Sequence, residues 1–223
     1  MPSKVLLLFL TTFLLVQSSF GKAVTTTVKP DLSDEQEIFS FKLLVYIVAE
    51  HSQLADSFLN NGKKLFQDVI ADVSAQDNKN EEITARLDEY SKLVGKIEKL
   101  QTKNLEDSSE DSSFIDKFQL MVDLSDMLVE SDVPSIKSPT AVDKLFYESL
   151  KKNGLDNLEH QFKDEFEKFA KGFVETAERI LNSATIEQWP EKTKMQDLLK
   201  NFNTENDLEK KIVLFEKIFD ILK

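Results

Sequence analysis

The chain has 223 residues, a formal net charge of −12 and no cysteine. A negative charge of this size disfavours nucleic acid and anionic membrane surfaces as partners. The lack of cysteine excludes disulfides and nucleophilic cysteine chemistry, so the fold must depend on side-chain packing. Only Arg86 and Arg179 among the 28 basic residues are arginines, so the sequence offers no arginine cluster of the kind that binds phosphate or carboxylate.

Residues 1–21 have the features of a secretory signal peptide. Lys4 precedes an apolar run over residues 5–16, and small residues lead to a cleavage site after Gly21. The run is shorter than the roughly 20 apolar residues that a membrane-spanning helix needs. We therefore expect an extracellular, secreted protein without membrane contact after signal removal, with an uncleaved anchor as the alternative. Residues 22–33 are expected to form an extended lead-in.

Residues 34–104 are predicted to form an N-terminal helical region. Its first helix repeats apolar residues over an arc wide enough for the centre of a bundle. These apolar positions include Ile38, Phe41, Val45, Val48, Ala55 and Leu59. Asn60-Asn61-Gly62 predicts the end of this helix, and a short helix is expected over Lys63–Val73. A heptad seam, typical of a coiled coil, then runs through Glu81–Lys103. The seam consists of Ile83, Leu87, Tyr90, Val94 and Ile97.

Residues 105–113 are predicted to be an acidic linker between two helical halves. The segment Glu106–Ser113 contains only Glu, Asp and Ser, a composition typical of a solvated connection. Ser108 is followed two residues later by Glu110, which resembles the sites of secretory-pathway kinases. Ser108 is therefore a candidate phosphorylation site, and an unmodified linker is the alternative.

Residues 114–223 are predicted to form a C-terminal helical bundle. Helices are expected over Phe114–Glu130, from a cap at Ser138 to Asn153-Gly154, over Asp156–Asn182, over Lys194–Phe202, and after a cap at Thr204. No alternating strand pattern recurs. The fold class is thus all-α, a multi-helix bundle of about eight helices, in one piece or in two helical halves.

Four phenylalanines at helical spacing dominate the longest of these C-terminal helices. They are Phe162, Phe166, Phe169 and Phe173. One interpretation is a core seam, since aromatic residues at this spacing usually pack against other helices. The alternative is a ligand site, in which these side chains line a helical cavity for a fatty acid, a retinoid or another small apolar ligand. Trp189 also has two interpretations. It either folds back on the core or serves as a surface anchor for a partner.

Motifs for catalysis, metal or cofactor binding are absent from the sequence. Only His51 and His160 could act as histidine bases, and His160 with Asp164 one turn later supplies two ligands where zinc sites need three or four. No His-Glu-x-x-His, glycine-rich phosphate loop or EF-hand loop occurs. We therefore expect no catalytic residue, no metal and no cofactor, and a protein that is not an enzyme.

The segment from Ser52 to Val73, together with the seam that follows it, resembles a known domain. The sequence of that segment is SQLADSFLNNGKKLFQDVIADV. Leu43 to about Leu100 is similar to the WSN domain of secreted nematode proteins. The resemblance implies a secreted helical domain of uncharacterised function, without an active site. Together these features favour a secreted, acidic, non-enzymatic protein that binds an unknown protein partner or forms an extracellular structural component. The alternative is a carrier of an apolar ligand.

Overall fold

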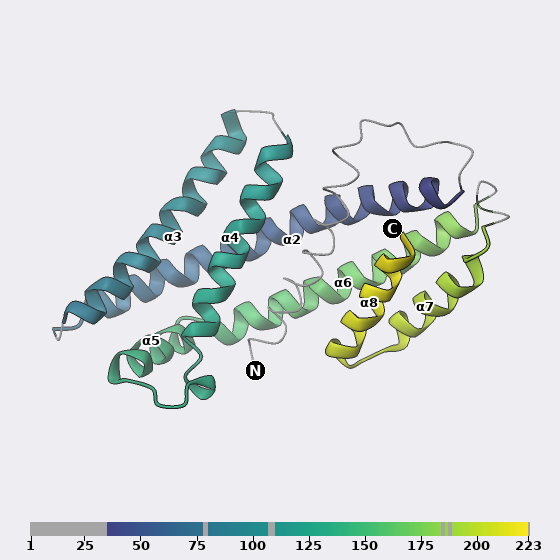
Figure 1. The fold of residues 1–223 in the computed structure, drawn as a ribbon. Coiled ribbons are helices and arrows are strands. Elements are labelled where there is room, and N and C mark those ends of the chain that lie inside the picture. The colour runs from purple at the N-terminus through teal and green to yellow at the C-terminus, as the bar shows by residue number, and fades with distance from the viewer. Residues whose placement is uncertain (1–34, 78–79, 107–109, 184–185, 187–188, 223) are drawn as a thin grey trace. The chain divides into compact units, whose positions relative to one another are not determined.

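The structure, a computed structural model, describes residues 35–77, 80–106, 110–183, 186 and 189–222 (Figure 1). Within these residues the chain forms α-helices and one 3-10 turn, η1, and no strand. The elements are α2 (Glu35–Ser74), α3 (Glu81–Glu106), α4 (Glu110–Glu130), η1 (Val133–Ser135), α5 (Ala141–Lys152), α6 (Leu155–Leu181), α7 (Lys192–Thr204) and α8 (Leu208–Leu222). The predicted all-α helical bundle is confirmed.

The helices group into two compact units. Of the described residues, Ser52–Asp164 form unit 1, whereas residues 35–51 and 165–222 form unit 2. The boundary between the units thus runs through α2 and α6, each of which contributes residues to both. This division differs from the one expected from the sequence, which separated residues 34–104 from residues 114–223. The units are made of interleaved stretches of chain and not of successive halves.

The segment expected to be an acidic linker contributes to two helices. Leu105 and Glu106 are the last residues of α3, and Glu110 to Ser113 are the first turn of α4. The candidate phosphorylation site Ser108 lies outside the described residues. Composition alone could not distinguish this arrangement from a linker.

Unit 1 is built on the C-terminal half of α2. The ring of Tyr90 on α3 stacks on Phe66 of α2 with 4.2 Å between centroids, and its edge meets Phe146 of α5 at 5.4 Å. The Tyr90 hydroxyl and Ser131 Oγ share a buried hydrogen bond of 2.8 Å. The predicted heptad seam of α3 is buried at Ile83, Tyr90, Val94 and Ile97. Unit 1 therefore has a continuous aromatic and aliphatic core.

Asn60-Asn61-Gly62 does not end a helix, and this prediction was wrong. The α2 helix continues through these residues to Ser74, and the short helix expected over Lys63–Val73 is its last part. The glycine serves close packing instead. A Cβ atom built at Gly62 would lie 2.3 Å from Leu124 Cδ2. Because Leu124 belongs to α4, the reason for this glycine lies far along the chain.

The phenylalanine seam fills the core of unit 2. Phe166, Phe169 and Phe173 are buried on α6. The ring of Phe173 lies 5.0 Å from Phe215 of α8 and 5.8 Å from Phe202 of α7, and α7 and α8 lie side by side in Figure 1. Phe162, at the end of unit 1, makes an edge contact of 5.2 Å with Phe58 of α2. Each ring of the seam thus meets another aromatic ring.

Trp189 also belongs to the core of unit 2. Its side chain is buried and its ring lies 5.1 Å from that of Phe39 on α2. The interpretation of Trp189 as a residue that folds back on the core is confirmed. Because it is the only tryptophan of the chain, its fluorescence reports on the packing of unit 2.

Part of the apolar arc expected to be core is exposed. The side chains of Phe41 and Val45 are 53% and 55% exposed, whereas Phe39, Leu43 and Ile47 on the other side of α2 are fully buried. Helical periodicity predicted an apolar face but not how much of it other helices would cover. The prediction that Phe41 and Val45 lie in the core was therefore wrong.

Two helix starts differ from those expected. Helix α5 is capped by Thr140 and not by Ser138, because the Thr140 hydroxyl accepts a hydrogen bond from the Asp143 amide and Asp143 Oδ2 accepts one from the Thr140 amide. This reciprocal pair is a capping box. Thr204 is the last residue of α7, and Asp207 caps α8 by accepting a hydrogen bond from the Lys210 amide at 3.1 Å. The predicted stop at Asn153-Gly154 is confirmed, with Gly154 at φ 111°.

Candidate functional site

The residues considered for catalysis do not form a site. His160 and Asp164 are exposed on α6, and no ion pair between them is found in the described part of the chain. The side chain of His51 lies outside the described residues. Among the residues that the structure describes, no three His, Asp or Glu side chains are grouped so as to hold a metal ion.

A largely buried polar cluster in unit 1 joins α3 to α5. Arg86 Nη2 of α3 donates to Asp143 Oδ1 of α5 at 2.8 Å, and the guanidinium carbon lies 5.3 Å from the Phe146 ring centroid. The Thr140 amide and then the Arg86 guanidinium hold the pKa of the Asp143 carboxyl below its ordinary value. Burial raises the pKa of the neighbouring Tyr90. Arg86 Nη1 is buried without a hydrogen-bond partner among the described residues, but the other polar groups bind one another or the start of α5, so the cluster supports the fold.

The Asp143 carboxylate predicts an acid-sensitive unit 1. Because its pKa is lower in the folded state than the value of 3.8 for an unfolded chain, Asp143 stabilises the fold above about pH 4. This contribution is lost as the pH falls through the lower folded-state pKa. We expect Asp143→Asn to reduce the free energy of unfolding at pH 7 by about 1–3 kcal/mol. It should also reduce the loss of stability between pH 5 and pH 3, which urea unfolding followed by circular dichroism would measure. Parallel pH profiles of the parent and the variant would contradict this assignment.

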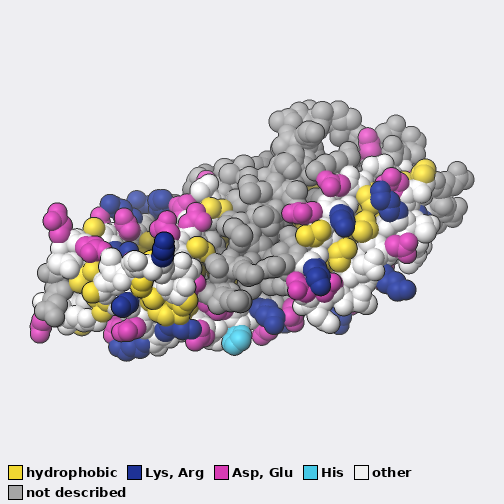
Figure 2. All heavy atoms as spheres, turned by 60° about the horizontal axis from the view of Figure 1, so that its bottom comes forward, with side chains coloured by type: hydrophobic (Ala, Val, Ile, Leu, Met, Phe, Trp, Pro, Cys, Tyr) yellow, Lys and Arg dark blue, Asp and Glu magenta, His cyan; other side chains and the backbone are white. Residues whose placement is uncertain are grey.

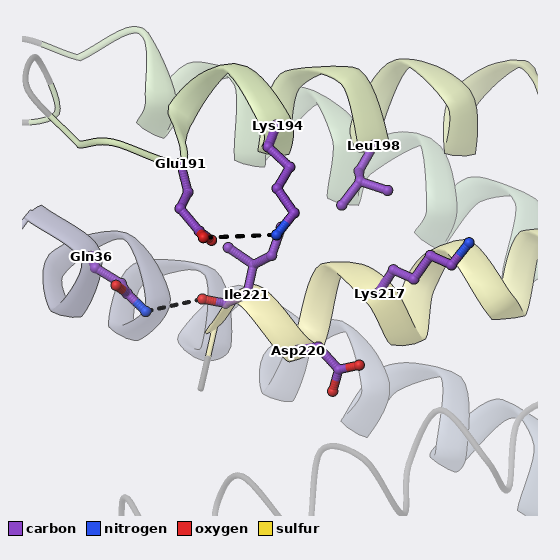
Figure 3. Close-up of a pocket in the computed structure, with 7 residues that line it drawn as sticks. All are labelled: Gln36, Glu191, Lys194, Leu198, Lys217, Asp220 and Ile221. Atoms are coloured by element: carbon purple, nitrogen blue, oxygen red, sulfur yellow. Dashed lines mark hydrogen bonds and ion pairs between the residues drawn. The ribbon is translucent and has the colours of Figure 1, made fainter.

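A cavity of about 500 Å³ in unit 2 lies where α7 and α8 meet the start of α2. Figure 3 shows seven side chains that line it. Gln36 Nε2 donates to the Ile221 carbonyl at 3.0 Å, and Glu191 pairs with Lys194 at 3.7 Å. The carboxylate of Asp220 points away from that ion pair (Figure 3). The charged groups of this cavity therefore do not converge on one point where a ligand could be bound.

A small cavity in unit 1 is lined by amide, charged and aliphatic side chains. Asn61, Asn153 and Asn157 line it together with Gly154, and its volume is about 180 Å³. Ligand pockets usually measure about 300–1,000 Å³. This cavity is below that range, and Leu65 and Leu158 are the only aliphatic side chains among its described lining residues, so it is too small and too polar for an apolar ligand.

A groove between α2 and α6 in unit 2 combines apolar and basic side chains. We call it the α2–α6 groove, and its volume is about 410 Å³. It is lined by Lys42, Val45, Tyr46, Thr176, Arg179, Ile180 and Ser183. Lys42 and Arg179 are exposed, and neither forms an ion pair within the described part of the chain. Because Phe41 lies one turn before Val45 on the same face of α2, it extends the apolar surface of the groove.

Tyr46 is the aromatic residue among those that line the groove. Its ring stacks at 6.4 Å on Phe169 of the core, and a Cβ atom at Gly172 would lie 2.3 Å from its hydroxyl oxygen. Gly172 therefore lets the phenol lie against the backbone of α6. Burial, and then the carboxylates of Glu50 and Glu175, raise the pKa of Tyr46 to about 12. Its hydroxyl is thus neutral at every physiological pH.

The described residues on the face shown in Figure 2 form no large patch of a single charge. Figure 2 shows acidic and basic side chains interspersed over the described part of the face that it presents, with hydrophobic side chains between them. Among the described helices, none is long and apolar enough to cross a membrane.

Comparison with known proteins gives no relative: no family model, no curated protein and no solved structure matches the chain. The resemblance to the WSN domain stays a prediction. The groove itself was missed by sequence reasoning, because its two walls lie on helices more than 120 residues apart. One feature of the sequence did point to the groove. The apolar arc of α2 is wider than the face that a helix usually buries in a bundle, so part of it could remain exposed.

Proposed function

We propose that the chain is a secreted, acidic and non-enzymatic helical protein that acts by binding another protein. The observation that carries the proposal is the division of its apolar residues. The phenylalanine seam meets other rings inside each unit, while Phe41 and Val45 lie exposed beside an open groove. Exposed apolar side chains beside a groove mark interaction surfaces more often than catalytic ones.

An apolar-ligand carrier is the weaker candidate. It requires a cavity along Phe162, Phe166, Phe169 and Phe173, yet their rings pack on Phe58, Phe202 and Phe215. The cavities described above do not include these four side chains in their lining. The negative charge of −12 likewise argues against nucleic acid as the partner.

Secretion and binding can be tested with the full chain in two steps. Expressed in a eukaryotic cell with its own N-terminus, the protein is expected in the culture medium with Lys22 as its first residue. The fluorescently labelled product is then expected to bind saturably to proteins of the extracellular fluid, with competition by unlabelled protein. Retention in the cell would argue against secretion. Lipid recovered in stoichiometric amount from the purified protein, without saturable protein binding, would favour the carrier.

A further inference from the structure

We propose that the α2–α6 groove is the docking site for an amphipathic helix of the partner, and that this helix carries acidic residues at one end of its apolar stripe. The proposal rests on the proposed function of protein binding and adds the site and the kind of partner. It is argued from the shape of the groove, the exposed apolar side chains and the two cations at its edge.

The shape and the apolar side chains favour a helix as the occupant. The two walls of the groove are themselves helices, and the surface between two packed helices is a depression that a third helix can fill with its ridges. Phe41 and Val45 are four residues apart, the spacing at which one helix presents side chains to another. Such grooves receive amphipathic helices through anchors at i and i+4.

The two cations set the charge of the occupant. Lys42 on α2 and Arg179 on α6 both line the groove, and neither is neutralised by an ion pair in the described part of the chain. A carboxylate placed between them would gain charge-assisted hydrogen bonds, which the planar Arg179 guanidinium can form in pairs. The chain as a whole is acidic, with 40 acidic residues against 28 basic ones, so a partner that is acidic at this point would be attracted by these two cations and repelled by most of the remaining surface.

The surroundings of Tyr46 limit where the partner's acids can lie. Burial is the main cause of the raised pKa of Tyr46, and the nearby carboxylates of Glu50 and Glu175 raise it further, so negative charge lies beside this part of the groove. Lys171 lies 3.9 Å from Glu175. Because both side chains are exposed to solvent, this ion pair neutralises the Glu175 charge only weakly. The partner helix must therefore be acidic where it meets Lys42 and Arg179, and uncharged or basic where it meets Glu50 and Glu175.

The test uses three synthetic peptides with a fluorescein label. Each is an amphipathic helix of about 16 residues with leucines three and four apart, and with alanine and glutamine elsewhere. The first carries two glutamates in its first turn, where the helix dipole favours them. In the other two peptides these positions hold glutamine or lysine. We expect the purified full chain to bind the glutamate peptide about tenfold more tightly than the lysine peptide by fluorescence anisotropy, with glutamine between them and with a smaller difference at high salt.

The decisive variants exchange the charges at the groove. In Lys42→Glu with Arg179→Glu we expect the order of the three peptides to reverse. Phe41→Ser with Val45→Ser should weaken all three by about tenfold. A matched control, Lys168→Glu with Lys200→Glu, changes the net charge equally on exposed positions of unit 2 outside the groove lining, and it should preserve the original order.

Three outcomes would overturn the proposal. These are no binding of any peptide at millimolar concentration, an unchanged order in the charge-exchanged protein, and a reversed order in the control. Concentration-dependent dimerisation that Phe41→Ser with Val45→Ser abolishes would instead make a second copy of the chain the occupant. If the saturable binding described under the proposed function persists in that double variant, protein binding stands and only this site fails.

Discussion

Replacing Phe173 with alanine is expected to lower the free energy of unfolding of unit 2 by about 3–5 kcal/mol. The Phe173 ring is fully buried and lies within contact distance of Phe169, Phe202 and Phe215, so its loss removes apolar contacts from three helices at once. The enclosing rings are themselves held by α7 and α8 and can collapse only in part. Urea unfolding followed by Trp189 fluorescence measures the effect, because the only tryptophan lies in the same unit.

The matched control is Phe41, the exposed phenylalanine beside the groove. Phe41→Ala removes the same atoms from a side chain that is 53% exposed, and we expect a change of less than about 0.5 kcal/mol. The comparison also bears on the carrier hypothesis. If Phe173 lined a cavity for a ligand, its truncation would alter the free energy of unfolding of the ligand-free protein little more than that of Phe41.

The second large effect is expected at Gly62. In Gly62→Ala the new methyl group would meet Leu124 Cδ2 at 2.3 Å, and Leu124 is fully buried and cannot swing into solvent. Overpacking of this kind costs about 1–3 kcal/mol, which exceeds the gain of up to about 1 kcal/mol in helix propensity. Thermal unfolding followed by circular dichroism should show a lower melting temperature. The opposite result is expected for Gly95→Ala on α3, because nothing lies within 4 Å of its added Cβ.

A double-mutant cycle isolates the steric cause. Leu124→Ala by itself leaves a cavity and is expected to destabilise unit 1 by about 2–5 kcal/mol. In that background the methyl group of Gly62→Ala has room, so the substitution should be neutral or stabilising. If Gly62→Ala costs the same amount in both backgrounds, Leu124 is not the obstacle, and a requirement of the α2 backbone would have to be sought instead.

The errors at Gly62 and at Phe41 have one physical origin. Helix class and helix phase follow from local spacing, and the seam of α3 and the phenylalanine seam of α6 were predictable for that reason. Whether Gly62 ends a helix or admits a neighbour depends on Leu124, which local spacing cannot identify. Which part of the apolar arc of α2 becomes core depends in the same way on where α6 and α7 pack.

Some of the missed features were present in the local sequence. Thr140 is followed three residues later by Asp143, the pattern of a capping box, and it lies closer to the first apolar residue of α5 than Ser138 does. The partner of Arg86 was not predictable locally. The guanidinium binds Asp143 on α5, 57 residues further along the chain, where burial makes the hydrogen bond stronger than an exposed pair would be.

The α2–α6 groove is the feature that was least predictable from the sequence. Lys42 and Arg179 are separated by most of the chain, and each alone resembles any exposed basic residue. The packing of Tyr46 against Gly172 and Phe169 brings their helices close enough to form one surface. A single sequence contains no sign of that proximity, so the site could be found only in three dimensions.

The passage of α2 and α6 through both units has a consequence for how the chain folds. Unit 1 is a continuous stretch, Ser52–Asp164, inserted into unit 2. During synthesis, residues 35–51 of unit 2 are made before Ser52–Asp164, and α7 and α8 are made after them. Residues 35–51 therefore stay unpacked until the ribosome has released the rest of unit 2. Their exposed apolar face, with Phe39, Leu43 and Ile47, is a hazard for aggregation in that interval. Long-range closure of this kind also slows folding, so we expect unit 1 to gain its protection from hydrogen exchange before unit 2.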